Sequence, residues 1–207
     1  MSDTGKLLAN VAAIVVIGGV LMRMFFIEVV RVNTNVMAPT LVYGDEVLVW
    51  KGAHADVTDV MVCEHPYRKG ELVFGRVIAK AGYTVRTDYN GQLYIGDDQT
   101  TTGSGRDVLF YDVTRKKQFD MQMRHIDFFG RHDHMYFQER GTKLRIRPYR
   151  VKTGVYLLGD NRMERQSDSR KFGEVQPEHC LGQVFMRWKA AEPTGDDLDN
   201  APLDLIR

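Results

Sequence analysis

Residue types suited to metal chemistry lie close together in the middle of the chain. His132, Asp133 and His134 are consecutive, and His125 precedes them. Imidazole and carboxylate groups bind Zn²⁺ and related ions, but this spacing matches no recognised metal site. The surrounding segment is polar and basic, so we predict a solvated surface loop. The sequence indicates no metal and no other cofactor.

The chain contains two cysteines, Cys63 and Cys180. Thiols pair as a disulfide in an oxidising compartment, whereas buried free thiols behave as small apolar side chains. Cys63 lies in an apolar run that is typical of a strand. Both alternatives, one disulfide or two buried free thiols, agree with the sequence.

Short β-type runs dominate the chain beyond Glu28 and must position any site. They occupy residues 28–32, 46–50, 60–63, 71–80, 155–158 and 183–188. Asn90-Gly91 separates two further β-rich runs, which is a strong hairpin signal. Many short strands without a long helical period predict a mainly β domain with antiparallel sheets. We place this domain at residues 28–190.

Two segments differ in composition from these strands. Residues 100–150 are more polar and aromatic with weaker strand signals, and Gly103–Lys152 contains twelve Lys and Arg against six Asp and Glu. We predict a smaller inserted lobe at about 100–150. Residues 191–207 have two prolines and an acidic bias, which predicts a flexible tail.

An apolar run follows a short N-terminal tail, residues 1–6. Residues 7–27 contain a single charged side chain, Arg23. At about 1.5 Å per residue a helix of this length matches a hydrocarbon core of roughly 30 Å, with Arg23 able to reach a head-group region. A cleavable signal peptide is the alternative, but no A-x-A-like site with a polar start follows the run. We predict one transmembrane helix, and Lys6, Arg23 and Arg31 leave its orientation open.

Overall composition excludes several classes of protein. Of the 207 residues, 43% are hydrophobic and 27% are charged, which is typical of a globular chain and not of a disordered one. The formal net charge of +1 argues against a general nucleic-acid-binding protein. Roughly 170 residues remain beyond the apolar run, enough for one domain with an inserted lobe.

Three segments, read in order, resemble the type I signal peptidases, the membrane-anchored serine proteases that remove signal peptides. They are Val36-Met37-Ala38-Pro39-Thr40-Leu41 with Gly44-Asp45, then Gly75-Arg76-Val77-Ile78 with Gly82 and Val85, and last Gly159-Asp160-Asn161-Arg162 with Ser167-Asp168-Ser169-Arg170. The last segment is highly specific, although it contains one residue more than the usual pattern. The resemblance implies a signal-peptidase-type β fold, anchored in the cell membrane, with the soluble domain outside the cytoplasm.

The resemblance also implies a serine nucleophile and a lysine general base, and this chain has neither. Val36 stands at the nucleophile position and carries no heteroatom that could attack a carbonyl. Gly75 stands at the general-base position and has no side chain. Loss of a serine-protease nucleophile alone typically costs about 10⁶ in turnover.

Other positions of the family's site are retained. Thr34 lies two residues before Val36, on the same face of a strand, and matches the position that offers a hydroxyl to the oxyanion. A rescue in which Thr34 attacks lacks a base, because Lys80 has the opposite strand parity to Gly75 and no histidine is suitably spaced. The polar framework that the resemblance implies comprises Met37, Pro39, Arg76, Asp160, Asn161, Arg162, Asp168, Ser169 and Arg170.

We therefore expect a catalytically inactive relative of signal peptidase I that keeps a groove for an extended peptide. The residues expected along it are Val30, Val32, Leu72 and Phe74. Such a groove binds by strand addition. The expected partners are the membrane, segments of exported or surface proteins, and another secretion or assembly subunit. The alternative is an active peptidase that uses non-standard residues or a partner subunit, and an inactivated laboratory variant is disfavoured because neither dyad position holds alanine.

Overall fold

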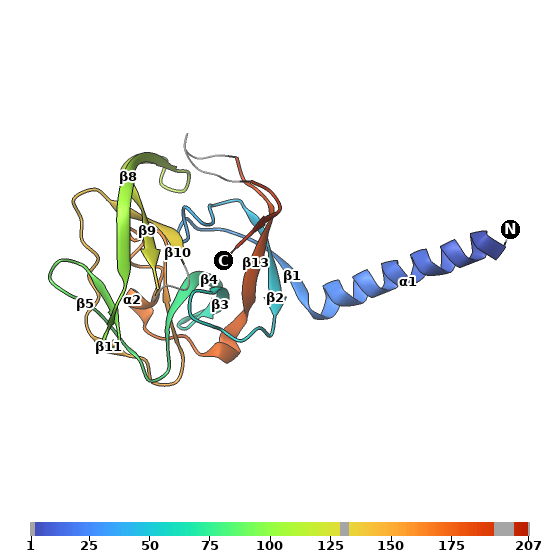
Figure 1. Cartoon of the computed structure of the whole chain (residues 1–207), viewed down its shortest axis with the longest axis horizontal. Helices are drawn as coiled ribbons and strands as arrows, with labels where there is room; N and C mark the ends of the chain where they lie inside the picture. The colour runs from blue at the N-terminus through green and yellow to red at the C-terminus, as the bar shows by residue number, and fades with distance from the viewer. Residues whose placement is uncertain (1–2, 129–132, 193–200, 207) are drawn as a thin grey trace.

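The computed structural model describes residues 3–128, 133–192 and 201–206 (Figure 1). The helices are α1 (Asp3–Phe25), α2 (Ser169–Phe172) and the 3-10 helix η1 (Pro177–His179). The strands are β1 (Ile27–Arg31), β2 (Glu46–Lys51), β3 (Val60–His65), β4 (Arg68–Lys80), β5 (Thr84–Thr87), β6 (Leu93–Ile95), β7 (Asp98–Gln99), β8 (Thr101–Asp112), β9 (Lys117–Asp127), β10 (Asp133–Glu139), β11 (Tyr149–Arg150), β12 (Val155–Leu158), β13 (Cys180–Lys189) and β14 (Asp204–Leu205). The prediction of a mainly β fold with antiparallel sheets is confirmed.

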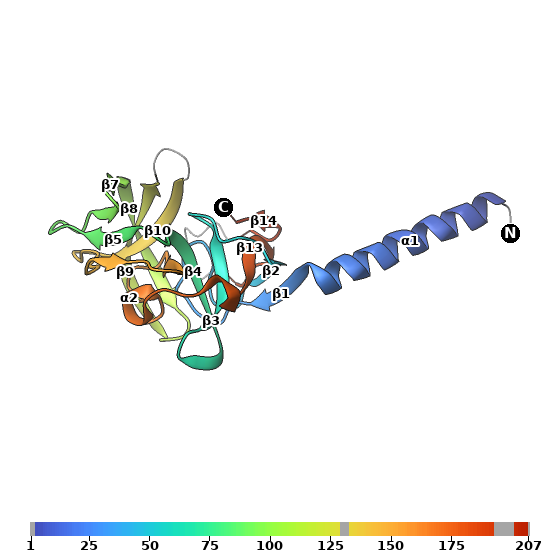
Figure 2. The ribbon, with the colours of Figure 1, turned by 90° about the horizontal axis from the view of Figure 1, so that it is seen from below.

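Helix α1 projects from the β domain and runs directly into β1 (Figures 1 and 2). It covers most of the segment for which the sequence predicts a transmembrane helix. Within the described residues, however, no helix is long and apolar enough to cross a membrane. The predicted span is therefore not shown by the structure.

The largest sheet has seven strands in the order β1-β2-β13-β3-β4-β12, with β14 added to β13. Period-2 alternation sets its inner face, as β2 shows: Val47 and Val49 are fully buried, whereas Trp50 is exposed. Two strand edges of this sheet have no partner strand on one side within the described residues. β1 pairs only with β2, and β4 pairs with β12 only over Arg76–Lys80, so the Glu71–Gly75 half of β4 has no strand on that side within the described residues.

The segment predicted as an inserted lobe forms a three-stranded sheet in the order β10-β9-β8. Its core side includes Phe110, Met121 and Phe137, all buried, and it packs against Ala38 and Val42 of the main domain. The outward side chains of β8 and β9 are largely polar or charged, which is why the strand signal in the sequence is weak.

A four-stranded sheet in the order β11-β5-β6-β7 completes the domain at the end opposite α1 (Figure 1). The predicted hairpin around Asn90-Gly91 is confirmed, because β5 and β6 pair across this turn. Gly91 has a φ of 87°, a left-handed conformation that glycine adopts without strain.

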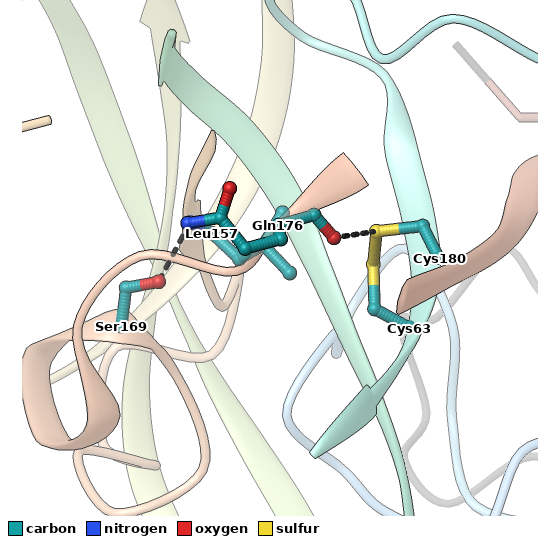
Figure 3. The surroundings of a disulfide bond; sticks show 5 residues. All are labelled: Cys63, Leu157, Ser169, Gln176 and Cys180. Carbon is teal, nitrogen blue, oxygen red and sulfur yellow. Dashed lines mark hydrogen bonds between the residues drawn. A yellow bond between two sulfur atoms is a disulfide. The ribbon is translucent and has the colours of Figure 1, made fainter. Parts of the chain in front are cut away.

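A disulfide joins the two cysteines, so of the two alternatives that agree with the sequence, two buried free thiols are excluded (Figure 3). Cys63 on β3 and Cys180 on β13 are direct cross-strand neighbours in the central sheet. The bond links residues 117 positions apart in sequence. It therefore ties the start of β13 to the middle of the sheet.

The C-terminal segment predicted as a flexible acidic tail is docked at its end. β14 pairs with β13, and Ile206 is only 7% exposed within the apolar cluster of the main sheet. Arg187, itself buried, donates to the carboxylate of Asp204 (3.4 Å) and to that of Asp45 (3.1 Å). A buried guanidinium is costly without carboxylate partners, so the pairing of Arg187 with Asp204 fixes the position of the C-terminal segment.

Candidate functional site

Val36 occupies a closed position in the loop that follows β1. Its side chain is fully buried, its amide donates to Thr34 Oγ1 (3.2 Å), and its carbonyl accepts from the amide of Asn161 (2.9 Å). A Cβ placed on Gly159 would lie only 2.7 Å from Val36 Cγ2. The side chain of Val36 therefore packs against the backbone of Gly159, and no reactive atom lies at the predicted nucleophile position.

Gly75 lies on the buried part of β4, where Leu157 of β12 fills the space that a side chain would use. A Cβ placed on Gly75 would lie 2.7 Å from Leu157 Cβ, closer than real Cβ contacts come. The amide of Leu157 in turn donates to Ser169 Oγ (2.8 Å; Figure 3), which fixes its backbone. The predicted general-base position thus carries no functional group. The side chain of Leu157, from the neighbouring strand β12, fills the space beside it.

Thr34 and Lys80 do not come together. Thr34 is half-buried and its Oγ1 accepts the amide hydrogen of Val36, whereas Lys80 Nζ pairs with Asp56 Oδ1 at 2.7 Å. The local Thr34 contact is a common turn interaction of hydroxyl side chains. The structure therefore offers no base to Thr34 through Lys80.

Arg76, next to Gly75, is the centre of a buried polar network. Its Nε and Nη2 donate to both oxygens of Asp160 (3.0 and 2.7 Å), and its Nη1 donates to the carbonyl of Thr58 (2.7 Å). Thr40 donates its hydroxyl to Asp160 Oδ2 (2.5 Å). Burial alone raises the pKa of Asp160, but the charge of Arg76 and these hydrogen bonds outweigh it, so the pKa lies below its usual value.

A second buried ion pair holds the loop after β12. Asp168 accepts from the amide of Gly159 (3.0 Å) and, as the N-cap of α2, from the amide of Arg170 (3.0 Å). The Arg170 guanidinium donates back to Asp168, with Nη2 at 2.7 Å, and to the carbonyl of Arg162 (2.8 Å). Paired and hydrogen-bonded charges of this kind are tolerated in an interior.

Asn161 and Arg162 link the main sheet to the inserted lobe. Asn161 Nδ2 donates to the carbonyl of Asn35 (3.1 Å), and the Arg162 amide donates to the carbonyl of Phe137 (2.8 Å). The Arg162 guanidinium lies 4.6 Å from the centre of the Tyr136 ring, and burial lowers its pKa to about 10. The predicted framework residues are therefore brought together, with Met37 buried in the adjoining apolar cluster and Pro39 half-buried beside it.

The residues predicted to line a peptide groove share one apolar cluster. Val30, Val32 and Phe74 are at most 8% exposed and pack with Val36, while Leu72 is half-buried at the margin. Their side chains are core, so they do not form the walls of an open groove. The edges of β1 and β4 described above lack a strand partner on one side within the described residues, but Val73, Phe74 and Gly75 of β4 are themselves buried.

The histidine segment differs from the solvated loop that the sequence predicts. His134 is 8% exposed, stacks on Phe128 with ring centres 5.3 Å apart, and has its Nε2 3.6 Å from Asp160 Oδ1. Burial, assisted by the charge of Arg76, lowers the pKa of His134 to about 3. His125 pairs with Asp133 at the surface, His132 lies outside the described residues, and no group of metal ligands occurs among those that are described.

Sequence reasoning missed the residues that close the site. Leu157, Gly159, Thr40 and His134 contact the predicted positions; the sequence places Thr40 and Gly159 in the motif segments without a role, His134 in a surface loop, and Leu157 only in a strand. The exact match between predicted and observed strand, Val155–Leu158, is the one signal that could have placed Leu157 beside β4.

The chain is thus an antiparallel β domain in which a buried polar framework surrounds Val36 and Gly75. The sequence model described as "Signal peptidase, peptidase S26" matches residues 4–189, so the chain belongs to this family. It is 29% identical over 194 residues to Signal peptidase I of Streptococcus pneumoniae strain R6, covering 81% of this chain and 85% of that protein. It is 27% identical over 194 residues to Signal peptidase I of Pseudomonas aeruginosa strain PAO1, covering 79% and 62% of the two chains.

Proposed function

We propose that this chain is a catalytically inactive member of the S26 family that binds extended segments of exported or surface proteins as an accessory or assembly factor. The observation that carries the proposal is the filling of both dyad positions. Val36 packs against Gly159, and Leu157 occupies the space beside Gly75. A serine would fit in the volume of Val36, but a lysine at position 75 would not fit unless Leu157 moved.

The two free strand edges support peptide binding by strand addition. Among the residues that the structure describes, β1 and the Glu71–Gly75 half of β4 have no strand partner on one side, and both border the apolar cluster that contains Val32 and Phe74. Unpaired main-chain groups of an edge strand bind an extended chain through its backbone. Binding of this kind requires no nucleophile and tolerates varied sequences.

We further propose that α1 attaches the domain to the cell membrane. Exposed apolar side chains run along the helix, including Leu8 (67%), Ile14 (70%) and Val15 (67%), and α1 stands clear of the β domain (Figure 2). Phe26 and Trp50 are half-exposed where α1 meets the sheet, a position suited to the aromatic belt of a membrane interface.

The domain is proposed to lie outside the cytoplasm. The Cys63–Cys180 disulfide supports this placement, because disulfides persist in oxidising compartments and are rare in the cytosol.

Flotation of the full chain with liposomes tests the proposed attachment through α1. Replacement of Ile14 and Val15 by lysine is expected to abolish flotation, and unchanged flotation would exclude α1 as the attachment.

Cleavage is tested with the purified full-length protein in detergent and a preprotein that carries an A-x-A site. We expect no cleavage by the native chain or by Val36→Ser/Gly75→Lys, because a lysine at 75 meets Leu157 Cβ. Addition of Leu157→Gly opens this space. Specific cleavage by the native chain would overturn the proposal in favour of an active peptidase, and its loss in Thr34→Val would identify the nucleophile.

Peptide binding is tested by photo-crosslinking a signal-peptide-like segment to single positions of the chain. Val29 on β1 and Glu71 on β4 border the proposed site, and Leu109 on β8 is an exposed control outside it. We expect crosslinks at the two edge positions and not at Leu109. Equal labelling at all three would mean that the segment adheres without a site.

A further inference from the structure

A cavity of about 710 Å³ lies among β5, β11 and α2, elements that Figure 1 shows at the end of the domain opposite α1, and two residues of the polar framework, Ser169 and Arg170, line part of it. Its walls come from the turn after β5, from the extended segment before β11 and from the start of α2, with Tyr156 of β12 lining its inner part. Cavities of this size hold small molecules. Nothing in the proposed peptide binding uses it.

Two arginines on one wall carry charge that no acidic group of the described residues neutralises. Arg145 and Arg147 are exposed and alternate with the buried Leu144 and Ile146, so both guanidinium groups are on the outer face of one extended segment. The ring of Tyr89 lies 5.6 Å from the Arg145 guanidinium. Two unpaired arginines at this spacing attract an anion and can each bind it through two hydrogen bonds.

The inner part of the cavity offers hydroxyl donors. Tyr156 is 1% exposed, and within the described chain its hydroxyl makes no hydrogen bond, although buried tyrosine hydroxyls usually have a partner. Burial raises the pKa of Tyr156, so it stays protonated and can donate. The Tyr149 hydroxyl accepts from the Glu174 amide (3.2 Å) and keeps its own hydrogen for another acceptor.

Other polar groups at the rim are already engaged. Asp88 Oδ1 accepts from the amides of Asn90 and Gln92, both at 2.8 Å, but its carboxylate keeps its negative charge, whereas Arg170 is neutralised by Asp168. Because Arg145 and Arg147 outnumber Asp88, the lining keeps a net positive charge, while the rings of Tyr89 and Tyr149 add flat apolar surface. A matching ligand is rich in oxygen acceptors, negatively charged and ring-shaped.

We propose that this cavity binds an anionic sugar, a ring that carries a phosphate or carboxylate group held by Arg145 and Arg147, with the Tyr156 hydroxyl as an inner donor. Helix α1, through which membrane attachment is proposed, projects from the other end of the molecule (Figure 2). The sugar is therefore a soluble molecule or a unit of a polymer that extends away from that membrane.

The test is calorimetric titration of the full-length protein in detergent with glucose 6-phosphate and with glucuronate, using glucose as the neutral control. Saturable binding of either anion and none of glucose is expected. Arg147→Gln should weaken binding by about tenfold and Tyr156→Phe by roughly three- to tenfold. Arg150→Gln removes an equal charge from β11 outside the cavity and should leave affinity within about twofold.

Two results would overturn the proposal: no saturable binding of either anion up to about 10 mM, or an equal loss in Arg147→Gln and Arg150→Gln, which would indicate diffuse electrostatic attraction. A galacturonate oligomer separates the two sources of ligand. Tenfold tighter binding of the oligomer than of the monomer indicates a polymer, and equal affinities indicate a small molecule. The Tyr156→Phe variant keeps the ring, so its loss of affinity reports the hydroxyl and not the packing.

Discussion

Gly75 and Arg76 are consecutive on β4, yet their surroundings have opposite character. Arg76 donates hydrogen bonds to oxygens of Asp160, Thr58 and Thr40, whereas Gly75 faces the side chain of Leu157. The polar framework is intact, and hydrocarbon packs beside Gly75, which we propose as the former general-base position. We infer that the framework contributes to the fold whether or not the chain cleaves peptides.

Asp160→Asn tests the framework and should have the largest effect. The variant leaves the buried guanidinium of Arg76 without its counter-ion, which costs about 3–5 kcal/mol in the free energy of unfolding. Urea denaturation measures the change. Asp56→Asn breaks the exposed pair with Lys80 and is the matched control, expected to change stability by less than about 1 kcal/mol. Similar losses in both variants would mean that the buried network is not special.

Gly75→Ala tests the filled dyad position. The new Cβ meets Leu157 Cβ at 2.7 Å, and overpacking of this kind costs about 1–3 kcal/mol. In a Leu157→Gly background the same substitution should cost clearly less, which a double-mutant cycle detects by denaturation. Gly103→Ala on β8 is the control, because its Cβ makes an ordinary contact of 3.5 Å with His125. If the effects of Gly75→Ala and Leu157→Gly on stability are additive, Gly75 and Leu157 are not in close contact.

His134 tests how the framework responds to acid, with the smallest expected effect. The pKa of His134 is about 3 in the folded chain, against an ordinary value of 6.5, so below pH 6.5 the unfolded chain binds the extra proton and stability falls. Between pH 7.5 and 5.5 the native chain should lose about 1 kcal/mol more than His134→Gln. If the free energy of unfolding falls equally with pH in the two proteins, His134 is not buried in its neutral form.

The sequence identified most of the framework because each member lies in a dense local motif. Asp160, Asn161, Arg162, Asp168, Ser169 and Arg170 fall within eleven consecutive residues and come together around one loop. Strand positions followed from period-2 alternation, as in β2 and β12. Local patterns of this kind need no knowledge of distant contacts.

The contacts across the sheet could not be inferred in the same way. The histidine segment contains His134 among charged residues and reads as a surface loop, but β10 turns this side chain inward against Phe128 and Asp160. The acidic tail gave no sign that Arg187 would bind Asp204 and bury Ile206. The ion-pair partners, Asp160 for His134 and Asp204 for Arg187, are 26 and 17 residues away, and propensity does not encode such contacts.

The sequence by itself determined the β class of the fold and the residues of the polar framework, because both follow from local residue type and spacing, and it predicts Val36 and Gly75 at the nucleophile and base positions. Only the tertiary structure decided that hydrocarbon packs at these positions, that Cys63 and Cys180 are paired, and that Arg147 and Tyr156 share one cavity. These are properties of side chains brought together from distant strands, because packing selects neighbours by shape and not by order along the chain.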